Sequence, residues 1–113
     1  MNFSEEWDKL KHLQVGQKIT TIRWNDYPET TVGKIVPIKL KGILTAEGRI
    51  TAIEFTEIGQ LSLDFIKQDT KKDMTFDRFM SLMRHWYRWK TGWNELKSIV
   101  NVYYIEIVGV VDT

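Results

Sequence analysis

The chain has 113 residues, of which 42% are hydrophobic and 27% are charged, as is usual for a soluble globular protein. This length fits one domain over residues 1–113. The absence of cysteine excludes disulfides and thiolate metal sites. Sixteen basic side chains nearly balance fifteen acidic ones, so the net charge gives no general preference for nucleic acid. No apolar run reaches the length of a membrane span, and residues 1–6 lack the pattern of a signal peptide. We therefore expect a cytoplasmic protein without a membrane partner.

The first elements are expected to be an amphipathic helix and a strand. Ser4 is followed by acidic residues, which is typical of a capped helix start. A stripe at helical spacing would face the core: Phe3, Trp7, Leu10 and Leu13. Gly16 then precedes a run rich in β-branched residues, Ile19–Trp24, which predicts a strand. His12 and His85 are the only histidines and lie far apart in the sequence, so we expect no metal site.

Two further strands are expected to pair as a hairpin. The segment Gly33–Lys41 alternates between apolar and polar residues, as a half-buried strand does. We expect Thr45–Arg49 to form the turn that follows, because it contains a glycine among polar residues. The second strand would be Ile50–Ile58, with Ile53 and Phe55 facing the core.

Two helices and a last strand complete the expected elements. Ser62 would cap a short helix within Gln60–Asp69. After a polar connector, Thr75 or Asp73 would cap a longer helix with one apolar stripe: Phe76, Phe79, Met80, Met83 and Tyr87. The segment Val102–Val111 is apolar on both faces, which predicts a central strand.

The expected order of elements is therefore helix, three strands, short helix, longer helix and strand. A single twisted sheet that curls into a small barrel, with helices packed at its ends, accommodates this order. The sequence thus predicts the α+β class.

A candidate ligand site lies where the first expected strand begins. Thr21 and Arg23 share one face of that strand, because side chains alternate between faces. Lys18 has the wrong parity, so it faces the same cleft only if it lies in the turn before the strand. Lysine, threonine and arginine at such a junction can hold an anionic or amide-bearing ligand. Trp24 and Tyr27 would either wall this pocket or pack on the barrel surface.

Cations and aromatic residues are interleaved in the segment Arg84–Trp93. Such a segment can stack bases and hold phosphates, in which case Arg84, Tyr87 and Trp89 would contact an RNA ligand. The tryptophans can equally cover a small barrel while the cations keep its rim in water. A third interpretation is a protein partner, because tryptophan is enriched at interfaces.

The spacing of Gly16, Lys18, Thr21 and Arg23 resembles the G-x-K-x-x-T-x-R signature of ASCH domains, a branch of the PUA-like β-barrels. Features that accompany this signature in the family correspond to four further segments: Phe3–Leu13, Gly33, Thr75–Tyr87 and Val102–Ile107. The resemblance implies a PUA-like barrel, an RNA or modified-nucleoside ligand and no cofactor.

The resemblance also implies an alternative, because some small bacterial ASCH proteins remove the acetyl group from N4-acetylcytidine. Carried over from them, Lys18 would be the base or nucleophile, and Thr21 would orient the reacting group. The family's glutamate position falls on Lys72, with Asp73 shifted by one residue and Asp69 more distant. With Asp73 as the tentative acid, we predict that the chain binds RNA or a nucleoside and hydrolyses N4-acetylcytidine poorly or not at all.

Overall fold

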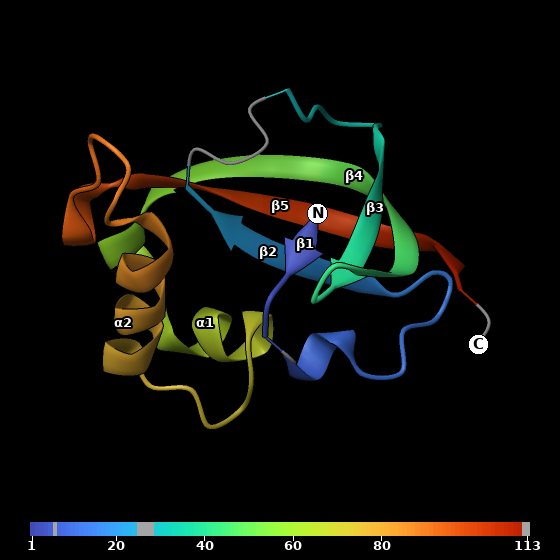
Figure 1. Cartoon of the computed structure of the whole chain (residues 1–113), viewed down its shortest axis with the longest axis horizontal. Helices are drawn as coiled ribbons and strands as arrows, with labels where there is room; N and C mark the ends of the chain where they lie inside the picture. The colour runs from blue at the N-terminus through green and yellow to red at the C-terminus, as the bar shows by residue number, and fades with distance from the viewer. Residues whose placement is uncertain (6, 25–28, 112–113) are drawn as a thin grey trace.

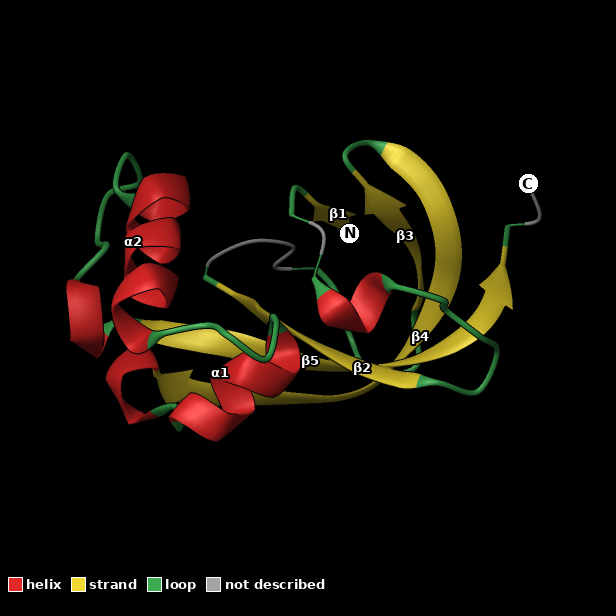
Figure 2. Cartoon of the chain, turned by 90° about the horizontal axis from the view of Figure 1, so that it is seen from below, coloured by secondary structure: helices red, strands yellow, loops and turns green. Residues whose placement is uncertain are grey.

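The computed structural model describes residues 1–5, 7–24 and 29–111. Within these residues, five strands form one sheet that curls into a half-barrel, and two α-helices pack at one end of it (Figures 1 and 2). The strand order is β1-β3-β4-β5-β2, with β1 parallel to β3 and the other neighbours antiparallel. The expected α+β class is confirmed. The strands are β1 (Asn2–Phe3), β2 (Lys18–Arg23), β3 (Ile35–Leu40), β4 (Ile43–Glu57) and β5 (Ile99–Val110).

The last strand, β5, lies between β4 and β2, which confirms the expected central position. Its core-facing side chains are almost completely buried, including Val100, Tyr103, Ile105 and Ile107. In contrast, β2 is the last strand in the sheet order. The strand that carries the candidate site therefore has a free edge toward the helices and the N-terminal segment.

The turn between β3 and β4 falls at Lys41 and Gly42, which have φ angles of 51° and 81°. The expected turn at Thr45–Arg49 is wrong, because this segment lies inside β4. Its glycine, Gly48, serves packing instead: a Cβ atom there would lie 2.3 Å from the Cγ2 atom of buried Ile105. Turn glycines and close-packed strand glycines give the same sequence signal.

The outer half of β4 differs from the prediction at one of the two residues that were expected to face the core. Its register against β5 shifts between Ile50 and Ala52, and such a bulge changes which side chains face the core. Phe55 is 69% exposed, so its expected inward orientation is wrong. Ile53 is partly buried and packs against the core.

Both expected C-terminal helices are confirmed. The short helix α1 (Leu63–Asp69) is capped by Ser62, whose hydroxyl accepts a hydrogen bond from the Phe65 amide. The longer helix α2 (Phe76–Tyr87) is capped by Thr75 in the same way. Its predicted stripe is buried apart from its first member, which is half-buried: Phe76, Phe79, Met80, Met83 and Tyr87. None of the described helices is long and apolar enough to span a membrane.

The expected N-terminal helix is wrong, although three of its four apolar stripe residues are buried as predicted. Residues 2–3 form strand β1, and only Asp8–Leu10 make a short 3₁₀ turn. Phe3, Trp7 and Leu10 are buried, and Leu13 is half-buried. The extended start is held by backbone pairing, since the Lys41 amide donates to the Phe3 carbonyl at 2.7 Å. This pairing with a distant strand outweighs the local helical pattern.

Candidate functional site

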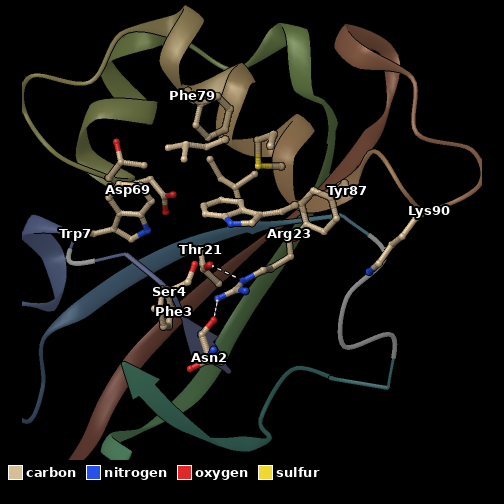
Figure 3. A pocket seen from close by; sticks show the side chains of 15 residues that line it. Asn2, Phe3, Ser4, Trp7, Thr21, Arg23, Asp69, Phe79, Tyr87 and Lys90 are labelled. Carbon is tan, nitrogen blue, oxygen red and sulfur yellow. Dashed lines mark hydrogen bonds between the residues drawn. The ribbon is translucent and has the colours of Figure 1, made fainter. Parts of the chain in front are cut away.

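A cavity of about 340 Å³ lies where the end of β2 meets the N-terminal segment and both helices (Figure 3). We call it the β2–α2 cavity. Polar and aromatic side chains from three elements line it: Thr21 and Arg23 of β2, Asp69 of α1, and Phe79, Trp86 and Tyr87 of α2. Residues far apart in the sequence thus converge on one hollow.

Arg23 is fixed at this cavity by bonds on two sides. Its Nε donates to the Thr21 hydroxyl at 3.0 Å, and its Nη2 donates to the Asn2 carbonyl at 2.7 Å. The guanidinium also lies 4.8 Å from the ring centre of Phe3. Both bonds are visible as dashed lines in Figure 3. The expected pairing of Thr21 with Arg23 on one face is therefore confirmed, and a cation is held in the cavity wall in a defined orientation.

The apolar wall of the cavity comes from α2 and the N-terminal segment. Trp7 and Trp86 both line it and meet edge to face, with ring centres 6.5 Å apart. Tyr87 lines the other side and is backed by Trp24 and Trp93, at 5.8 and 5.7 Å between ring centres. Trp24 therefore supports the wall from behind rather than facing the cavity. Of these two predicted ligand residues, Tyr87 therefore lines the cavity and Trp24 packs behind it.

Lys90 adds a second cation to the lining. Its ammonium lies 5.2 Å from the ring centre of Tyr87, within the range of a cation–π contact. Figure 3 shows Lys90 and Tyr87 on one side of the cavity and Asp69 with Trp7 on the opposite side. The cavity thus has a cationic end and an end that carries a carboxylate.

A buried ion pair forms this acidic end. Lys9 Nζ lies 2.8 Å from Asp69 Oδ1, and the two side chains are only 6% and 5% exposed. The Thr20 hydroxyl donates to the same oxygen at 2.7 Å, and Lys9 also donates to the Thr20 carbonyl. Desolvation lowers the pKa of Lys9, although the neighbouring Asp69 carboxylate acts in the opposite direction. The pair ties α1 and the 3₁₀ turn to the free edge of β2.

Lys18 does not share the β2–α2 cavity, so the expectation of one cleft for Lys18, Thr21 and Arg23 is wrong for Lys18. It lies inside β2 as its first residue, opposite Glu106 of β5. Strand parity therefore turns its side chain away from Thr21. Lys18 lines a separate hollow of about 410 Å³.

The other predicted site residues divide as follows. Arg84 is exposed and makes two hydrogen bonds to Glu95, outside the cavity. Trp89 is 72% exposed and lies 4.5 Å from the Arg88 guanidinium. Asp73 is exposed and does not line the cavity. Tyr27 lies outside the described residues.

Sequence reasoning missed Lys9 and Lys90, and it ranked Asp69 below Asp73. Lys9 belongs to no motif of the sequence, and no local pattern shows that it meets Asp69 sixty residues later. A signal for Asp69 did exist, because it is the last residue of a helix that the Ser62 cap predicted correctly. Its burial at that helix end depends on how the helix packs in the folded chain.

Fold and site together define a small α+β protein with a curled sheet and a cavity lined by aromatic and charged side chains. No protein-family model matches the chain, and no curated protein matches it significantly. Among solved structures, it is similar to protein EF3133 from Enterococcus faecalis V583, of the family DUF984. The TM-score is 0.65 at 15% identity, and the match covers 84% of this chain. This chain spans 63% of the length of that protein, and the likeness concerns the fold alone.

Proposed function

We propose that the chain is an ASCH-type, PUA-like domain that binds single-stranded RNA or a nucleoside in the β2–α2 cavity. The observation that carries this proposal is the meeting of Thr21 and Arg23 with the aromatic side chains of α2 around one hollow. The curled sheet supports it, because the resemblance implies such a fold. The signature strand β2 supplies the polar half of the site, and α2 supplies the apolar half.

The chemistry of the lining suits a nucleotide. A base stacks on or between aromatic side chains, and Trp7, Trp86 and Tyr87 supply them. A phosphate is attracted by cations, and Arg23 and Lys90 place two charges in the same lining. The near-zero net charge of the chain adds no general attraction for nucleic acid to these local charges.

The size of the cavity limits what enters it. Its volume of about 340 Å³ is at the lower end of ligand pockets, which range from about 300 to 1,000 Å³. A single nucleoside is the ligand whose size best suits a cavity of this volume. An RNA ligand would therefore insert one unpaired nucleotide, as is common in sequence-dependent RNA recognition.

The test is a titration of the protein with CMP and with a short fluorescent oligoribonucleotide at low and high salt. Because Trp7 and Trp86 line the cavity, occupancy should change tryptophan fluorescence. We expect affinity to fall as salt rises, since phosphate contacts release counterions. Lys90→Ala and Arg23→Ala should each weaken binding about tenfold, the loss of one hydrogen bond to a charged group.

The matched control is Arg84→Ala, which removes one positive charge from an exposed site outside the cavity. It should bind like the wild type. Absence of binding at low salt would refute the proposal. So would an Arg84→Ala protein that loses as much affinity as Lys90→Ala, because the effect would then be one of general charge.

Amide hydrolysis is a second candidate function, favoured by one observation. Asp69 places a carboxylate in the same cavity as Thr21, and such a pair can serve as base and orienting group. The lysine next to this carboxylate is Lys9, not Lys18. Any hydrolytic site in this chain would therefore use a different lysine from the one that the resemblance implies.

A further inference from the structure

The two carboxylate oxygens of Asp69 differ in their hydrogen bonds to the protein. Oδ1 accepts hydrogen bonds from Lys9 Nζ at 2.8 Å and from the Thr20 hydroxyl at 2.7 Å. Among the described residues, no hydrogen bond reaches Oδ2. The residue is only 4% exposed, yet it lines the β2–α2 cavity. Because Oδ2 is not fully buried, it borders this cavity and can accept a hydrogen bond from a donor on a ligand.

The position of this oxygen defines which ligand atoms suit it. An ionised carboxylate only accepts hydrogen bonds, and it repels other oxygen atoms at close range. Lys9 and Thr20 already fix its orientation, so little rotational freedom remains to be lost when a ligand binds. A phosphate is favoured at the opposite end, where Lys90 lies (Figure 3). The ligand should therefore carry an anionic group at one end and an N–H donor at the other.

We propose that Asp69 Oδ2 accepts a hydrogen bond from the exocyclic amino group of a base, so that the cavity selects amino-bearing bases over uracil. This inference rests on the proposed function, because it assigns the base end of the same site. Uracil presents its ring N–H between two carbonyl oxygens, and these would approach the carboxylate. Carboxylates accept from the cytosine amino group in the same manner in nucleic-acid recognition.

The experiment compares CMP with UMP: where CMP has an exocyclic amino group and an unprotonated ring nitrogen, UMP has a carbonyl oxygen and a ring N–H. AMP and IMP form a purine pair with the same difference. Dissociation constants are measured from tryptophan fluorescence for the wild-type protein. In each pair that the protein binds, we expect the nucleotide with the amino group to bind about tenfold more tightly than its carbonyl counterpart. This is the usual discrimination from one base contact of this kind.

The variant is Asp69→Asn, which keeps the shape and an oxygen for Lys9 and Thr20. Its amide NH₂ group would then face the cavity and donate, so the preference should shift toward UMP. Loss of folding alone cannot produce such a reversal. Circular dichroism and a melting curve show whether the variant is folded. If it is not, the relative affinities of the wild-type protein for CMP and UMP decide whether Asp69 selects the amino group.

Each outcome separates the two proposals. If none of the nucleotides or oligoribonucleotides binds, the proposed function is refuted and this inference with it. If CMP and UMP bind with equal affinity, or UMP binds more tightly to the wild type, the proposed function stands and the role of Asp69 is overturned. A preference for CMP that reverses in Asp69→Asn supports both.

Discussion

The buried pair of Lys9 and Asp69 makes a strong prediction about stability. Replacing Asp69 with alanine leaves the Lys9 ammonium buried, with the Thr20 carbonyl as a hydrogen-bond acceptor and the Phe3 ring centre at 5.3 Å. Removing one member of a buried pair costs about 3–5 kcal/mol, because an uncompensated charge remains. The bond to Thr20 persists, so we expect about 3 kcal/mol for Asp69→Ala. For a domain of this size, that corresponds to a melting temperature lower by about 12 °C.

The assay is urea unfolding at neutral pH, followed by tryptophan fluorescence and by circular dichroism. The double variant Lys9→Met/Asp69→Ala should recover most of the loss, since no charge is then buried without a partner. The matched control is Glu95→Ala, which breaks the exposed pair with Arg84. Its unfolding midpoint should not change measurably, because exposed ion pairs contribute little.

Two results would refute this reasoning. Asp69→Ala could prove as stable as the wild type, which would mean that water reaches Lys9 and that its burial is not costly. The double variant could also prove less stable than Asp69→Ala alone. In that case the Lys9 side chain would contribute through its packing and its bond to the Thr20 carbonyl, and not through the pair.

The same pair gives a pH dependence with a defined sign. Because burial lowers the pKa of Lys9 below 10.5 in the folded protein, the unfolded chain binds more protons at pH values between the folded pKa and 10.5. Stability should therefore rise with pH in that window. Unfolding measured at several alkaline pH values should show this rise in the wild type and not in Lys9→Met. A wild-type stability that falls throughout the window would contradict the direction of the shift.

Two further predictions concern packing and catalysis. Gly48→Ala should destabilise the protein by about 1–3 kcal/mol, since its Cβ atom would overlap Ile105. The control is Gly109→Ala, whose Cβ atom would meet no atom within 4 Å. Equal urea unfolding midpoints for the two variants would contradict the packing argument. Incubation with N4-acetylcytidine, followed by chromatography, should show slow release of cytidine or none, because Lys18 lies outside the cavity. Rapid release would reverse this expectation, and its loss in Asp69→Asn but not in Lys18→Ala would identify the acid.

The sequence by itself determined the elements whose signals are local. Ser62 and Thr75 predicted the starts of both helices, because a capping hydroxyl acts within three residues of itself. The β-branched run predicted β2, and the alternation of its side chains correctly placed Thr21 and Arg23 on one face. These features depend on neighbours along the chain, so no knowledge of distant contacts was needed.

Only the tertiary structure decided which of the site residues meet. Lys18 began inside the strand and not in the turn before it, and this shift of one residue moved it to another face. Asp69 became part of the cavity because α1 packs against the free edge of β2, where Lys9 neutralises its charge. The start of the chain became a strand because β3 offered it backbone partners. Burial and pairing between distant segments depend on the whole fold, and a local pattern contains no information about them.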